Sequence, residues 1–167
     1  MDNEILFSET QKFNQWWLWL ILLSFYGLII FVVIIVVASQ KSIDKPIRNL
    51  ILVLAAVLII FPTILFLNFK LETEIRQDGV YVKFFPFHLS FKEYKWSEIS
   101  KSFVRQYNPI GEYGGWGFRI GPYGKAFNVS GDKGLQLQFN NGKRLLIGTN
   151  KPSELTEVLK TIGKLKT

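Results

Sequence analysis

The residues that could support catalysis are few and scattered along this 167-residue chain. His88 is the sole histidine, and it stands in the aromatic segment Phe85-Pro86-Phe87-His88-Leu89, where Glu93 is the nearest carboxylate. A lone histidine without a second base or a set of ligands is more typical of a packed or surface residue than of a general base or a metal ligand. The sequence has no cysteine, which excludes a thiol nucleophile, a zinc–cysteine site and an iron–sulfur cluster.

Two carboxylates and a glycine-rich segment are the other features that could carry chemistry. Glu72 and Glu74 share one face of a predicted strand, but Arg76 follows on that face, which indicates an exposed row of charges. Residues 111–134 hold eight glycines. The G-x-G at Gly115-Trp116-Gly117 is followed by strand-like alternation, whereas nucleotide-binding loops lead into a helix. No G-x-S-x-G occurs. The sequence therefore predicts a non-enzyme without a metal, a cofactor or a small-molecule substrate.

Basic side chains are the remaining lead to a function. The formal net charge is +7, and Lys and Arg are attracted to anionic lipid headgroups at a membrane surface. Arg105, Arg119 and Lys125 fall among aromatic residues and glycine turns, so they are the candidates for a ligand-facing patch. Charges dispersed over a solvated surface are the alternative. The sequence shows no continuous basic stripe, so nucleic acid is not expected as a partner.

Charge and apolar sequence are divided between two parts of the chain. Residues 1–69 contain four basic and four acidic residues, whereas residues 70–167 contain sixteen and nine and carry the whole net charge. The first part holds two uncharged runs, 16–38 and 50–67, which as α-helices would be about 34 Å and about 27 Å long. Such lengths suit a hydrocarbon core of roughly 30 Å. We therefore expect a transmembrane helical hairpin over 16–69, preceded by a separate N-terminal segment, 1–15.

The ends of the first apolar run give further expectations about the membrane. Trp16, Trp17 and Trp19 are expected to anchor that run at the interface, where indole rings are favoured. Signal-peptide cleavage is not expected, because acidic residues precede the run and it is longer than an ordinary signal core. Two spans place both termini on one side. The basic residues flanking the spans are nearly balanced, so they do not fix which side that is.

From residue 70 the pattern changes to the alternation typical of β-strands. Asp78-Gly79 and Asn141-Gly142 predict two tight hairpin turns. Thr149-Asn150-Lys151-Pro152 predicts the start of an amphipathic helix over about 152–165. Residues 70–167 are thus predicted to form about seven short strands closed by one C-terminal helix.

This β-rich half resembles the pleckstrin-homology-like (PH-like) domains of bacterial membrane proteins that carry two membrane helices. The residues that carry the resemblance are IRQDGVY (75–81), WSEI (96–99), GWGFR (115–119), NGKRLLIGT (141–149) and PSEL (152–155). The resemblance covers roughly residues 70–165 and implies a small, mainly β, half-open barrel with a C-terminal capping helix. It also favours a cytoplasmic location of both termini. Eukaryotic relatives of that fold often bind phosphoinositides in a basic mouth, but the first hairpin turn here, Gln77-Asp78-Gly79, is acidic and tight.

Together these features predict a cell-membrane protein for which the lipid bilayer is one partner. It would present a PH-like binding or scaffold domain at the membrane surface to a protein partner or to a second copy of itself. Two alternatives stay open. The chain could be an accessory or regulatory subunit of a larger membrane transport or envelope enzyme complex, or its basic domain could bind anionic lipid headgroups electrostatically.

Overall fold

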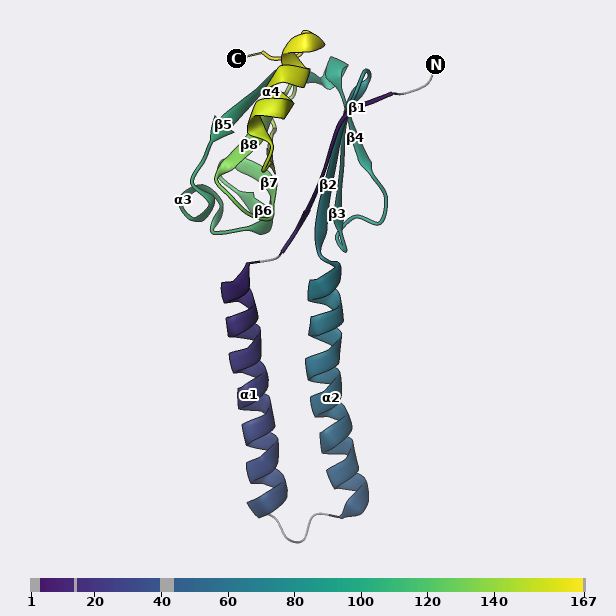
Figure 1. Ribbon diagram of the computed structural model, residues 1–167, viewed down its shortest axis with the longest axis vertical. Helices are drawn as coiled ribbons and strands as arrows, with labels where there is room; N and C mark the ends of the chain where they lie inside the picture. The colour runs from purple at the N-terminus through teal and green to yellow at the C-terminus, as the bar shows by residue number, and fades with distance from the viewer. Residues whose placement is uncertain (1–3, 14, 40–43, 167) are drawn as a thin grey trace. The chain divides into compact units, whose positions relative to one another are not determined.

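The computed structural model describes residues 4–13, 15–39 and 44–166, and the chain divides into two compact units (Figure 1). The helical unit is Asn14–Asn68, and the β unit joins Met1–Phe13 to Phe69–Thr167. The helical unit is therefore an insertion in the chain of the β unit.

The helical unit contains two helices of 24 residues each, α1 (Trp16–Ser39) and α2 (Lys45–Asn68). Both are long and apolar enough to cross a membrane, which confirms the two predicted apolar helices. The predicted start of the second at residue 50 is wrong, because α2 begins five residues earlier, at Lys45. Pro46 occupies the first turn, where the missing N–H of a proline leaves no hydrogen bond unmade.

α2 continues through Pro62, whose ring nitrogen cannot donate a hydrogen bond. The next residue, Thr63, donates its hydroxyl to the carbonyl of Ile59 at 2.6 Å. Since that hydroxyl proton is used, the hydroxyl of Tyr26 on α1 is the donor in the 2.7 Å contact with Thr63 Oγ1. These polar groups thus find their hydrogen-bond partners within the helical unit. A segment that lies in hydrocarbon would require this.

The first sheet of the β unit is antiparallel and has the order β1-β2-β3-β4. Its strands are β1 (Ile5–Lys12), β2 (Lys70–Arg76), β3 (Gly79–Phe85) and β4 (Lys92–Lys95). The predicted turn between β2 and β3 is present, but Gly79 is needed there for space. A Cβ on Gly79 would lie 2.6 Å from the carbonyl oxygen of Tyr94 on β4.

The second sheet has the order β5-β8-β9-β7-β6 and includes one parallel pair, β7 with β9. Its strands are β5 (Ile99–Gln106), β6 (Gly117–Gly121), β7 (Gly124–Asn128), β8 (Lys133–Phe139) and β9 (Arg144–Gly148). A five-residue helix, α3 (Pro109–Tyr113), connects β5 to β6. The described part of the chain thus contains nine strands: eight lie in residues 70–167, where about seven were predicted, and the ninth is β1.

Strand pairing among the described residues leaves the two sheets separate, so the expected half-open barrel is replaced by two sheets that are not closed into a barrel. The short 3₁₀ helix η1 (Trp96–Glu98) lies between β4 and β5 and directs the chain from one sheet to the other. Trp96 is buried at this point, and its indole nitrogen donates to the carbonyl of Arg76 at 3.0 Å.

The division at residue 70 predicted an N-terminal segment separate from the β domain. The segment is instead part of the β unit. β1 pairs with β2 in a register that sets Lys12 opposite Lys70 and Ser8 opposite Glu74. Its buried face consists of Phe7, Glu9 and Gln11. Because two of these three side chains are polar, the apolar alternation that marks a strand is hidden in the sequence.

The main core of the β unit is made of side chains from both sheets and from helix α4 (Pro152–Thr161). Leu155 and Leu159 are the fully buried residues of α4, and the helix contacts β1, β5 and β8. It ends four residues before the predicted residue 165. Gly163 has a φ of 65°, in the left-handed region that commonly follows a helix end.

Two buried polar side chains of β1 join the first sheet to the start of α4. The Glu9 carboxylate accepts the hydroxyl of Thr149 at 2.5 Å and the backbone N–H of Asn150 at 2.8 Å. Gln11 Nε2 donates to the carbonyl of Gly148 at 2.7 Å. Glu9 and Gln11 are 6% and 3% exposed, so these bonds are shielded from water. A carboxylate is also favoured at the positive end of a helix.

We expect Glu9→Gln to lower the free energy of unfolding by about 1–3 kcal/mol, because the buried charged acceptor of two donors is lost. The matched control is Glu4→Gln, an exposed position on the same segment, for which we expect a change within about 0.5 kcal/mol. Thermal and urea unfolding of the full chain in detergent measure both. Equal stability of the two variants would contradict a joining role for Glu9.

Candidate functional site

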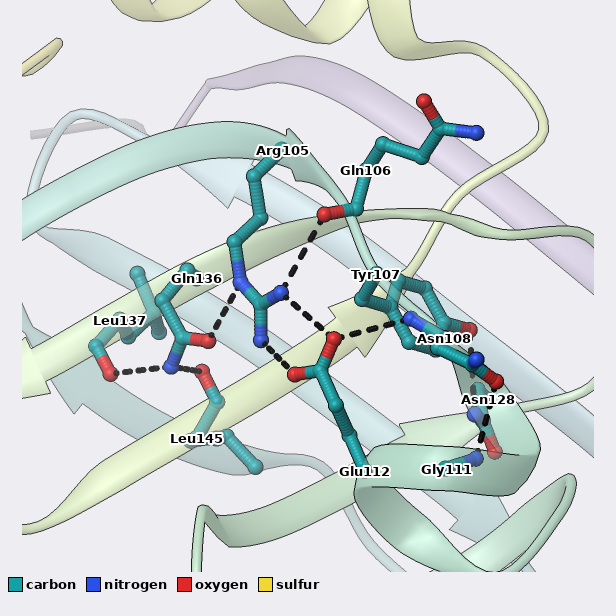
Figure 2. Close-up of polar contacts among 10 residues, drawn as sticks. All are labelled: Arg105, Gln106, Tyr107, Asn108, Gly111, Glu112, Asn128, Gln136, Leu137 and Leu145. Atoms are coloured by element: carbon teal, nitrogen blue, oxygen red, sulfur yellow. Dashed lines mark hydrogen bonds and ion pairs between the residues drawn. The ribbon is translucent and has the colours of Figure 1, made fainter.

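Arg105, the first of the predicted ligand-facing residues, lies on β5 inside a polar network (Figure 2). Its Nε donates to Gln136 Oε1 at 3.1 Å, and its Nη1 and Nη2 donate to the two carboxylate oxygens of Glu112 at 3.1 and 2.6 Å. All three guanidinium nitrogens are therefore engaged within the protein. This forked geometry fixes the side chain as well as neutralising it.

Glu112 occupies its position because the local sequence starts a short helix at Asn108. The Asn108 side chain accepts the N–H of Gly111 at 2.9 Å, and Pro109 takes the first helical position. Glu112 Oε1 in turn accepts the N–H of Asn108 at 2.9 Å. Gly114, with a φ of 70°, ends the helix. Arg105 thus ties β5 to α3.

The electrostatics agree with a structural pair. The hydrogen bond from Arg105 lowers the pKa of Glu112 more than burial raises it, and the same bond raises the pKa of Arg105. Behind the pair, Tyr107 is buried and accepts the side-chain N–H of Asn128 at 3.0 Å. Burial raises the pKa of Tyr107 to about 12, so its hydroxyl stays neutral. This network supports the loop between β5 and β6.

Arg119, the second candidate, is exposed on β6, the edge strand of the second sheet. Its Nε donates to the carbonyl of Trp116 at 2.9 Å. Arg105 and Arg119 lie on β5 and β6, the two opposite edge strands of the second sheet, so strand pairing does not bring them together.

Lys125, the third candidate, lines a surface hollow of about 710 Å³. Lys143, in the turn between β8 and β9, and Arg144, the first residue of β9, line the same hollow. Glu98 is the carboxylate among the lining residues. Apolar surface comes from Tyr94 and Phe139, whose rings lie 5.5 Å apart, and from Ile120. Three cations, one carboxylate and an aromatic pair can hold a negatively charged group that carries an apolar body.

Lys143 and Arg144 were missed by sequence reasoning as candidate site residues. The Asn141-Gly142 turn could have indicated them, because the two cations that directly follow a tight turn lie at the end of the sheet. The predicted hairpin is present, but its turn is not the type I′ turn that Asn141-Gly142 predicted. That turn needs a positive φ at both residues, whereas only Gly142, with a φ of 79°, has one. What the sequence could not show is that β7 returns parallel to β9 and places Lys125 opposite Leu145.

His88 is buried in an aromatic cluster and is only 6% exposed. Its ring lies edge-on to Phe127 at 5.2 Å and to Phe118 at 5.9 Å. Burial lowers the pKa of His88, and the charges of Lys92 and Lys125 lower it further. A neutral, packed imidazole fits the non-catalytic interpretation of this residue. Within the described ranges, no group of three or more His, Asp or Glu side chains could hold a metal ion.

Trp16, Trp17 and Trp19, the predicted interface anchors, form the first turn of α1. Trp16 is 73% exposed and Trp17 is 38% exposed. Trp19 instead packs edge-on against Phe66 of α2 at 5.4 Å. Trp16 and Trp17 thus present indole rings at one end of the helix pair, while Trp19 helps to hold the pair together.

Comparison with known proteins adds one finding. A family of unknown function (DUF6141) matches residues 2–163. The chain belongs to this family. No curated protein and no solved structure matches it. The match begins before β1 and ends beyond α4, so the DUF6141 range includes both units and the insertion of the helices between β1 and β2.

We expect Glu112→Gln to destabilise the β unit by about 1.5–3 kcal/mol, because Arg105 would keep its charge and lose a charged acceptor. The control is Glu154→Gln, whose ion pair with Lys151 is about half exposed and should contribute less than about 1 kcal/mol. Urea unfolding of the full chain gives both values. A Glu112 variant no weaker than the control would show that Arg105 does not depend on this contact.

We also expect an acid-dependent loss of stability that His88 causes. Its folded pKa lies below the ordinary value of 6.5, so the unfolded chain takes up the proton first. Its contribution is complete above about pH 6.5 and is lost as the pH falls through the folded pKa. His88 is the only histidine, so His88→Asn should make the free energy of unfolding less dependent on pH between about pH 7.5 and 5.5. An unchanged slope would contradict a neutral buried imidazole.

Proposed function

We propose that the chain is an integral membrane protein in which α1 and α2 anchor the β unit at the membrane surface. In this proposal the β unit is a PH-like binding or scaffold module without chemistry of its own. Its partners are the bilayer and either another protein or a second copy of the chain.

The observation that carries the proposal is the insertion of the two apolar helices between two neighbouring strands. β1 precedes α1, β2 follows α2, and the two strands pair directly, with Lys12 opposite Lys70. Two strands that pair directly in an open sheet cannot lie on opposite sides of a bilayer. Both strands must therefore stand on the same side of any membrane that the helices cross, and two crossings meet that condition. We propose the cytoplasmic side.

The hollow lined by Lys125, Lys143 and Arg144 supports a binding role for the β unit. None of these three cations forms an ion pair with a described carboxylate. They differ in this from Arg105, whose charge Glu112 neutralises. We propose that the hollow binds an acidic side chain or the C-terminal carboxylate of a partner, with Tyr94 and Phe139 contacting its apolar part.

Purification of the full chain from membranes in mild detergent tests this proposal. We expect a protein partner or a second copy to be retained, and the double variant Lys143→Ser/Arg144→Ser to lose it, because two of the three cations that line the hollow are removed. The matched control is Lys95→Ser/Lys101→Ser, which removes two exposed lysines that do not line the hollow.

Two outcomes would contradict the proposal. If alkaline carbonate extracted the unmodified chain from membranes, α1 and α2 would not act as a membrane anchor. A transporter or enzyme retained in fixed stoichiometry by both double variants would favour an accessory subunit instead.

A further inference from the structure

The segment between β3 and β4 exposes apolar side chains that a water-soluble surface rarely shows together. Leu89 is 80% exposed, Phe87 is 55% exposed and Phe91 is 37% exposed. We call residues 86–91 the apolar loop. Clustered exposed apolar residues on a folded domain mark an interaction surface.

The apolar loop is attached to the rest of the β unit by the residue at its centre, His88. The His88 side chain is buried, its backbone N–H donates to the carbonyl of Phe84 at 2.8 Å, and its ring packs against Phe127. Phe87 stacks on Phe118 with ring centroids 5.2 Å apart. Since His88 is buried and its neighbours Phe87 and Leu89 are exposed, the exposure of these two side chains is built into the fold.

The register of the first sheet locates the apolar loop at the end where the chain leaves for the helices. Lys12, the last residue of β1, pairs with Lys70, the first of β2, and Lys70 pairs with Phe85, the last of β3. The loop therefore starts beside the strand ends that connect to α1 and α2. The opposite end of this sheet is the turn at Gln77 and Asp78, about 20 Å away along β2.

Aromatic contacts within the β unit bring the loop close to these connections. The ring of Phe69, one residue after α2 ends, lies 5.9 Å from the ring of Phe87 and 5.9 Å from that of Phe13. Consecutive Cα atoms are only about 3.8 Å apart. The loop thus contacts Phe69, the residue of the β unit that is bonded to the end of the helical unit.

Lysines surround the apolar loop at the same end of the sheet. Lys12 and Lys70 face each other across the β1–β2 pair, and Lys92 follows the loop. The Lys83 ammonium lies 5.8 Å from the centre of the Phe91 ring. Glu72 accepts from Lys70 and also contacts Lys83, so it offsets only part of this charge.

We propose that the apolar loop inserts Phe87 and Leu89 into the interfacial layer of the bilayer, while the surrounding lysines contact anionic lipid headgroups. Apolar side chains ringed by lysines are the combination that interfacial binding uses. The proposal rests on the proposed function, since it requires that α1 and α2 cross a membrane. The β unit would then be attached to the membrane in two ways: through its covalent connections to α1 and α2, and by shallow insertion of the apolar loop.

Because the chain has no cysteine, a single introduced cysteine can carry a nitroxide spin label. The test compares Leu89→Cys with Gln77→Cys, which is exposed at the opposite end of the same sheet. Both full-length variants are reconstituted in vesicles of phosphatidylcholine with phosphatidylglycerol. We expect the label at 89 to show a several-fold higher ratio of collision with oxygen to collision with a water-soluble nickel chelate. Vesicles of phosphatidylcholine alone, or high salt, should reduce this difference.

Three results would overturn the inference. Equal exposure of the two labels to the nickel chelate, in a chain that resists carbonate extraction, would place the loop in water and leave the anchoring role intact. Protection at 89 that is accompanied by dipolar broadening between labels would assign the loop to contact with a second copy. Protection that is independent of lipid charge and salt would remove the headgroup contacts from the proposal. Release of the chain by carbonate identifies the separate failure of the membrane anchor.

Discussion

The pairing of β1 with β2 is the constraint on which the rest of the β unit depends. β1 forms an edge of the first sheet, and its buried Glu9 and Gln11 reach the end of β9 and the start of α4. One strand therefore completes a sheet, closes one side of the core and holds the last helix. The helical unit between β1 and β2 keeps their ends within reach, because α1 and α2 form a hairpin whose own polar groups are bonded internally.

The charge of the protein falls into two classes with different physical roles. Arg105 and Arg76 are each bound by a neighbouring carboxylate, Glu112 and Glu74, at 2.6 Å, and both serve the fold. The cations of the hollow around Lys125 form no ion pair with a described carboxylate, and a single carboxylate, Glu72, serves both Lys70 and Lys83 beside the apolar loop. Basic side chains thus lie beside exposed apolar surface at two places, the hollow and the apolar loop.

Composition and turn chemistry were enough to predict the two long helices, the hairpin turns at Asp78-Gly79 and Asn141-Gly142, and a C-terminal helix. β1 could not be predicted, because Glu9 and Gln11 occupy its buried face and its partner strand lies about sixty residues further along the chain. The role of Arg105 was hidden for a similar reason. Its partner Glu112 is seven residues away and is brought back only by the Asn108 cap and the short helix α3. Local signals in a sequence do not report such returns of the chain.

The insertion of α1 and α2 between two adjacent strands also sets the order in which the protein can be made. β1 emerges from the ribosome before α1, and the sheet neighbour with which it pairs is complete only after both apolar helices and then β2 have been synthesised. Its buried face is protected from premature association by the polar side chains of Glu9 and Gln11, which make it a poor template for aggregation. Its bonds to Thr149 and Gly148 must wait still longer, until β9 is complete. Synthesis of the helical unit thus precedes folding of the β unit that begins before it.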